Sequence, residues 1–186
     1  MKFINPKWKS WLTGAVFGLG IAACPVSAYA LEGDWEVGGD VTSVFMFSPG
    51  GIGVGGDFFA KYNIYDGLSL TGMVGAHYVH SSHELENKLK LGSFGLYSIR
   101  AGIDYALDII NWVPSAGIHL ESYFSDNKDY HWHRHGKGFG LDADIQIQYR
   151  GVRHLGIGLF LGYHFMFTSP DYITLGINVS WFSGEF

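Results

Sequence analysis

Histidine is unusually frequent in this chain, with nine among 186 residues. Six of these histidines fall at or near two long polar stretches: His77, His80, His83, His131, His133 and His135. The last three alternate along the chain, so an extended segment would turn them to one side. If the two stretches meet, three or four neutral imidazoles could bind Zn²⁺ or Cu²⁺. The favoured alternative is that these histidines are solvated, because their spacing matches no compact metal site. A related hypothesis is that the clustered histidines sense acid.

A second group of residues is charged and alternates with apolar neighbours: Asp40, Asp57, Lys61, Arg100, Asp104, Glu121, Asp142 and Asp144. On strands such positions share one face, which His119 and His164 also join. In an enclosed interior these side chains would form a network of salt bridges and hydrogen bonds that closes the interior to solutes. The alternative is a narrow pore with a weak preference for cations, because acids outnumber bases.

Hydrolysis would need a nucleophile, a base and an acid, and His80, Ser82 and Glu84 supply these types within five residues. We do not expect an enzyme, because the surrounding stretch is typical of a loop. The glycine-rich residues 50–56 lie between two expected strands without a following helix. They therefore predict a flexible loop rather than a nucleotide site, and no cofactor is expected.

Residues 1–30 predict a secretory signal peptide. Residues 1–9 hold three lysines and no acid, and a short apolar run over 11–23 precedes Ala-Tyr-Ala at 28–30. Cleavage after Ala30 is favoured over lipid modification of Cys24, whose surroundings resemble a bacterial lipoprotein cleavage site.

The expected mature domain, residues 31–186, has no cysteine, so disulfides and thiol chemistry are excluded. It carries nine basic against 17 acidic residues, a net charge of −8. Because this composition offers no basic face, a nucleic-acid partner is not expected.

The mature domain repeats a two-residue period that indicates strands. In residues 141–149 every odd position is apolar or aromatic and every even position is an acid or amide. Eight segments show this alternation: 35–47, 57–65, 68–79, 95–105, 112–124, 141–149, 155–167 and 172–182. Each is long enough for a tilted strand to cross a bilayer.

Alternation alone does not say which face is buried, but three features favour apolar side chains facing lipid. The segments exceed the five or six residues of ordinary strands. Connections at 65–67, 106–111 and 150–154 are short, whereas 81–90 and 125–137 are long and polar. Aromatics mark the expected strand ends: Trp35, Trp112 and Trp181 at the rim of short turns, and Phe45, Phe47, Tyr78, Phe124, Phe167 and Tyr172 at the other. The sequence therefore predicts an all-β, eight-stranded antiparallel up-and-down transmembrane barrel.

The last expected strand, followed by a terminal aromatic, resembles the C-terminal assembly signal of bacterial outer-membrane barrels. The residues that fit its pattern are Thr174, Gly176, Val179, Trp181 and Phe186. The mature chain as a whole resembles the small eight-stranded barrels of the OmpA and OmpX kind.

This resemblance implies an integral protein of a Gram-negative outer membrane, in contact with lipid, lipopolysaccharide and the barrel-assembly machinery. A structural or surface-interaction role is expected, with the loops at 81–90 and 125–137 presented outside to an unknown ligand. A narrow porin-like channel is the alternative. A lipid A acyl hydrolase is less favoured, because the His-Tyr-Ser-Asn stretch of the deacylases has no counterpart.

Overall fold

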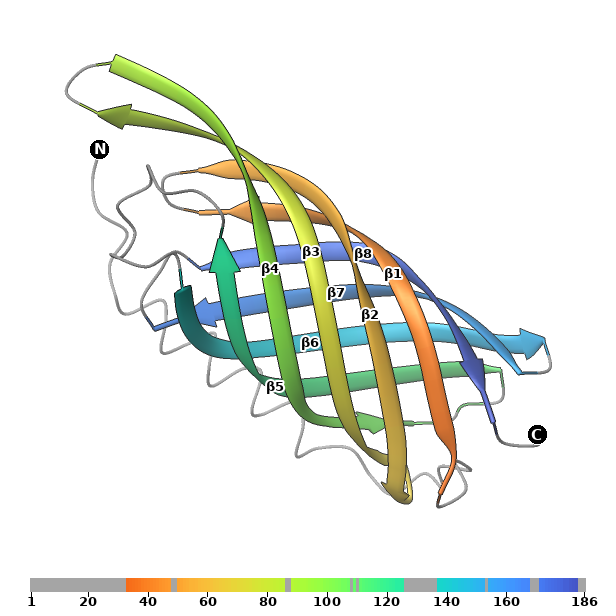
Figure 1. Ribbon diagram of the computed structural model, residues 1–186. Helices are drawn as coiled ribbons and strands as arrows, with labels where there is room; N and C mark the ends of the chain where they lie inside the picture. Colours follow the sequence, from red (N-terminus) through yellow and green to blue (C-terminus); the bar gives the residue numbers. More distant parts are fainter. Residues whose placement is uncertain are drawn as a thin grey trace.

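The computed structural model describes residues 33–47, 50–85, 88–107, 109, 111–125, 137–152, 154–167 and 171–183. They form a closed barrel of eight antiparallel strands, each paired with its neighbour in sequence (Figure 1). The strands are β1 (Trp35–Met46), β2 (Gly51–Tyr65), β3 (Leu68–Leu85), β4 (Lys88–Ala106), β5 (Trp112–Ser125), β6 (Lys137–Val152), β7 (Leu155–Met166) and β8 (Tyr172–Phe182). The predicted fold class is confirmed.

The barrel closes because β8 pairs with β1 along the full length of both strands. This seam runs in register from Glu36 opposite Phe182 to Met46 opposite Tyr172. A closed barrel has no free edge, so every strand has a partner on both sides. Among the residues that the structure describes, no helix is long and apolar enough to cross a membrane.

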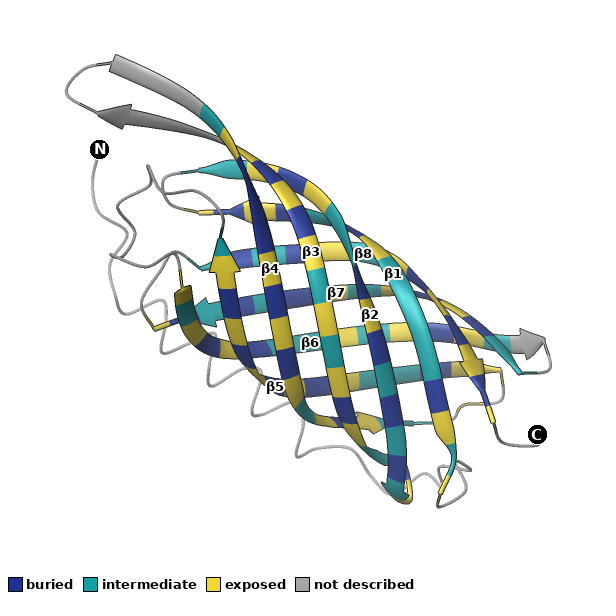
Figure 2. Cartoon of the chain, viewed as in Figure 1, coloured by how far each residue is buried: buried dark blue, intermediate teal, exposed yellow. Residues whose placement is uncertain are grey.

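Side chains alternate between the outer surface and the interior along each strand (Figure 2). On β1, Val41 is 74% exposed whereas the adjacent Thr42 is 2% exposed. The same division places Ile99 and Ile177 outside and Arg100 inside. The barrel therefore turns its apolar face outward, as predicted from the alternation.

The two rims of the barrel differ, and we name them by their connections. At the turn end, the strands are joined by the short connections 66–67, 107–111 and 153–154. At the opposite rim, the hairpin end, β3 and β4 pair as far as Leu85 and Lys88 and project beyond the other strands (Figure 1).

Aromatic side chains surround the outer surface at both rims. At the turn end, Trp35 packs on Tyr62 with ring centroids 4.9 Å apart, and Trp112 packs on Tyr149 at 5.1 Å. The hairpin end exposes a second set: Phe45, Phe47, Tyr78, Phe124 and Phe167. Tyr172 was expected in this second set, but it is the first residue of β8 and points into the barrel, where it is buried.

The glycine-rich residues 51–56 are part of β2 and not a loop, contrary to the sequence prediction. Ile52 and Val54 point outward, and the alternating Gly53 and Gly55 face the interior. A Cβ on Gly55 would lie 2.5 Å from Cα and Cδ2 of His77 on β3. Glycine is therefore needed here because the histidine ring fills the space.

The predicted loop at 81–90 is also largely strand, since β3 continues to Leu85 and β4 begins at Lys88. Four successive polar residues, 81–84, hid this extension in the sequence. Strand prediction from the sequence depended on apolar alternation, which these residues lack. The other predicted loop lies between Ser125 and Lys137, outside the described residues.

Arginine in place of Leu159, which points outward from the middle of β7, should lower the free energy of unfolding by about 2–4 kcal/mol in lipid, because a charge would enter hydrocarbon. The same change at Phe167, just beyond the end of that strand, should cost about 0–1 kcal/mol. Urea unfolding of vesicle-inserted protein, followed by tryptophan fluorescence, measures both. If the arginine variants at Leu159 and Phe167 lost equally little free energy of unfolding, Leu159 would face water.

Candidate functional site

The centre of the barrel is occupied by Arg100, which comes from β4 and is 4% exposed. Its Nη2 lies 2.6 Å from Oδ1 of Asp57 on β2, and its Nη1 lies 3.2 Å from Oδ2 of Asp142 on β6. The guanidinium therefore bridges strands that are not neighbours. Two more groups join Asp57: its backbone N–H donates to Asp40 at 2.8 Å, and His77 Nε2 lies 3.6 Å from its Oδ2.

A second group of ion pairs lies toward the turn end and surrounds Asp104. Lys61 Nζ is 3.1 Å from Asp104 Oδ2, and the Thr71 hydroxyl donates to the same oxygen. His119 Nε2 is 3.3 Å from Asp104 Oδ1, while its Nδ1 is 3.4 Å from Asp144 Oδ2. Asp142 Oδ2 lies 3.2 Å from the same Nδ1, so three adjacent strands, β4, β5 and β6, bring three carboxylates to one imidazole.

A third group lies toward the hairpin end around Glu121, which is fully buried. His164 Nδ1 lies 2.7 Å from Glu121 Oε2, and the Tyr172 hydroxyl donates to Glu121 Oε1. The other nitrogen of His164 is 2.9 Å from the Thr174 hydroxyl. The rings of His164 and Tyr172 stack with centroids 4.0 Å apart. Glu121 is therefore held by groups from two other strands.

A further polar cluster closes the interior at the turn end. The Gln148 amide donates to Ser180 at 2.7 Å and to Glu36 at 3.2 Å. Arg150 Nη2 lies 3.3 Å from Glu36 Oε2, and its guanidinium stacks on the Phe182 ring at 3.9 Å. These residues link β1, β6 and β8 across the end of the barrel.

Apolar side chains fill the interior at the hairpin end. We call this cluster the apolar cap; it consists of Val44, Met46, Val79, Phe94, Leu96, Tyr123, Met166 and Tyr172. The prediction of a polar interior was thus incomplete, because near the hairpin end apolar residues occupy both the inner and the outer face of the strands.

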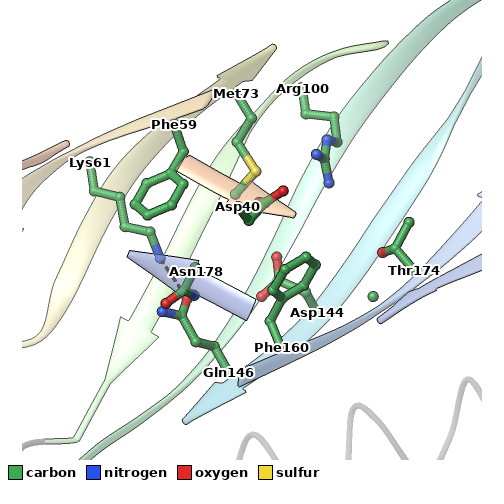
Figure 3. Close-up of a pocket in the computed structure, with 11 residues that line it drawn as sticks. Asp40, Phe59, Lys61, Met73, Arg100, Asp144, Gln146, Phe160, Thr174 and Asn178 are labelled. Carbon is green, nitrogen blue, oxygen red and sulfur yellow. Dashed lines mark hydrogen bonds between the residues drawn. The ribbon is translucent and has the colours of Figure 1, made fainter. Parts of the chain in front are cut away.

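A small cavity remains between the ion pairs and the strands that surround them (Figure 3). Its volume is about 20 Å³, enough for one water molecule and not for a larger solute. Lys61, Arg100 and Asp144 point toward it, and Lys61 donates to Gln146 across 3.4 Å.

The structure brings the eight predicted interior residues together on the inner face of the barrel, and it adds residues that the sequence analysis did not include in the predicted network. Those additions are Glu36, His77, His119, Gln148, Arg150, His164 and Tyr172. His119 and His164 could have been chosen, because both share the polar face of their strands.

Of the six histidines predicted to cluster at the rim, the structure describes the side chains of His77 and His80. His77 is buried inside, beside Asp57, because it has the inward parity of β3 and lies well below the strand's end. His80 points outward and pairs with Ser93, with Nδ1 and Oγ 2.9 Å apart. The side chains of His83, Ser82 and Glu84, and residues 131–135, lie outside the described part of the chain.

The residues of the predicted assembly signal divide between both faces of β8. Thr174 points inward, whereas Val179 and Trp181 are about half exposed on the outer surface. Gly176 lies between these levels, beside Val41 of β1 and Phe160 of β7. Phe186 lies outside the described residues.

No family model matches the sequence, and no curated protein matches it. Solved structures do resemble it. Neisserial surface protein A has a TM-score of 0.54 at 16% identity, over 81% of this chain and 97% of that protein. The outer-membrane protein OprG of Pseudomonas aeruginosa gives 0.56 at 11%, over 80% and 96%.

Ail, the attachment invasion locus protein of Yersinia pestis, gives a TM-score of 0.51 at 12% identity, over 82% of this chain and 99% of that protein. At these identities the likeness is one of fold. The fold of this chain is that of the small eight-stranded outer-membrane β-barrels.

Proposed function

We propose that the chain is an integral protein of a Gram-negative outer membrane, exported by a signal peptide cleaved after Ala30. Its role is structural or one of surface interaction, without catalysis and without solute passage. The observation that carries this proposal is an interior filled from end to end by the barrel's own side chains.

The outer surface supports insertion into lipid. Large apolar side chains such as Val41, Leu159 and Ile177 are exposed all around the middle of the barrel. A water-soluble protein rarely exposes so continuous an apolar surface. Hydrocarbon solvates these side chains, and the aromatic residues at both rims suit the two membrane interfaces.

The interior supports a closed barrel rather than the alternative, a narrow porin-like channel. Arg100 spans from β2 to β6, and Glu121 joins β5 to β7 and β8. A hydrated ion would have to break these buried pairs and then cross the apolar cap. Both steps carry a large desolvation penalty.

The projecting β3–β4 hairpin supports a role at the cell surface. We place the turn end in the periplasm and the hairpin end outside, as in membrane barrels whose periplasmic turns are short. Lipid and lipopolysaccharide would surround the barrel, and the barrel-assembly machinery would read β8 through Val179 and Trp181. An external ligand would meet the hairpin and the connection between β5 and β6.

A planar lipid bilayer holding the purified protein should stay electrically silent under applied voltage, because the interior has no continuous water path. Heat-modifiable mobility on a gel shows that the same sample contains the closed barrel. Steady openings of defined conductance would favour the porin-like channel instead.

An epitope inserted between residues 86 and 87, in the β3–β4 connection, should be labelled by antibody on intact cells. The same epitope between Asp66 and Gly67, in the β2–β3 turn, should be labelled only after the outer membrane is permeabilised. Equal labelling of both insertions on intact cells would contradict the orientation and the location.

Methionine in place of Arg100 leaves Asp57 and Asp142 without their shared counter-charge. The free energy of unfolding should fall by about 3–5 kcal/mol, the cost of a broken buried ion pair. The double variant R100M/D57N should recover part of that loss, because one unpaired charge is removed. Urea unfolding measures both. A loss for R100M below about 1 kcal/mol, typical of a solvated pair, would contradict a dry interior.

A further inference from the structure

We propose that Asp104, His119 and Asp144 form a divalent-metal site inside the barrel, a property beyond the structural role above. The three residues lie on adjacent strands, with Gly117 of β5 paired to both carboxylate residues. One ligand atom from each of them lies within 4.8 Å of the others. One imidazole and two carboxylates are a ligand set that Zn²⁺ accepts, with a fourth position left for water.

The strongest support comes from the two nitrogens of His119, whose side chain is completely buried. Nδ1 lies 3.2 Å from Asp142 Oδ2 as a hydrogen bond. Nε2 makes no hydrogen bond, although Asp104 Oδ1 lies only 3.3 Å away and makes none either. With the proton on Nδ1, the lone pairs of Nε2 and Asp104 Oδ1 are both left free. A metal ion about 2.1 Å from each of these two atoms would have an Nε2–metal–Oδ1 angle of roughly 105°, close to the tetrahedral angle.

Neighbouring groups hold His119 and Asp104 in the way that metal ligands in proteins are usually held. A metal-binding histidine usually donates its second ring N–H to a carboxylate, which here is Asp142. Asp142 is itself held by Arg100 at 3.2 Å. The second oxygen of Asp104 is occupied by Lys61 and the Thr71 hydroxyl, which leaves Oδ1 as the ligand atom.

The absence of a side chain at Gly117 lets the three groups approach one another. A Cβ at this position would collide with Asp104 Oδ1 and lie 2.7 Å from His119 Cε1 and 3.0 Å from Asp144 Oδ1. The Asp144 side chain is 12% exposed and lines the small internal cavity, which places water-sized space beside the site. A side chain larger than glycine would occupy the meeting point of the three groups.

Charge around His119 also favours a cation. The facing carboxylates are Asp104, Asp142 and Asp144, and the nearby cations are Lys61 and Arg100. With a neutral imidazole these five groups carry one net negative charge. A divalent metal ion would change this net charge to one positive, whereas an extra proton on His119 would neutralise it and is the competing explanation that the experiment distinguishes.

The test uses the refolded mature barrel with the rim histidines removed, the variant H80A/H83A/H131A/H133A/H135A, so that loops cannot bind metal. After chelator treatment, Zn²⁺ is titrated against a chromophoric competitor. We expect about one equivalent bound. Asp144→Asn and His119→Gln should each weaken binding at least about tenfold, because each removes a ligand. The matched control His77→Gln removes a buried histidine outside the site and should leave the affinity unchanged.

Two results would overturn the proposal: no Zn²⁺ binding by the barrel without rim histidines, or binding that Asp144→Asn weakens no more than His77→Gln. Gel mobility before and after heating confirms that each variant is folded. If His119→Gln or Asp144→Asn fails to fold, the site is tested instead by adding Co²⁺ to the barrel that lacks only the rim histidines. Visible absorption bands of four-coordinate Co²⁺ support the site, and their absence refutes it. Conductance and surface labelling test the structural role separately.

Discussion

Pairing of the backbone is the constraint from which the rest of this structure follows. Inside hydrocarbon, an unpaired N–H or C=O costs several kcal/mol, so a sheet survives there only when it closes on itself. The β1–β8 seam, in register from Glu36 to Met46, completes that closure. Once the sheet is closed, each side chain points either to the outer surface or to the interior. The sequence must then alternate along every strand, as Val41 and Thr42 do.

The polar interior has a consequence for export as well as for packing. A strand that was apolar on both faces would form a long apolar run, and such runs form transmembrane helices instead. Alternating residues such as Asp142, Asp144 and Gln146 prevent this in β6. An eight-stranded barrel is too narrow to hydrate these groups, so they must pair with one another. Arg100 and Glu121 meet this need by reaching partners on strands other than their neighbours.

The sequence determined which face each residue occupies better than how high it lies in the barrel. Alternation alone placed Leu141 outside and Asp142 inside, because the period of a strand is two. It did not show that β3 extends to Leu85, so His77 was assigned to the rim rather than to the interior. Height depends on the stagger between strands, which alternation does not encode. For the same reason the partners of Arg100 could not be identified, although all the participants were known to share one face.

The two ends of the interior perform different physical tasks. The apolar cap at the hairpin end excludes water and shields the ion pairs beneath it from screening, which strengthens them. The turn end is closed by hydrogen bonds among Glu36, Gln148 and Arg150. Both ends of the interior are therefore closed, the hairpin end by apolar packing and the turn end by hydrogen bonds. A barrel built in this way can hold an ion at the proposed site without conducting it, because no continuous path joins the two rims.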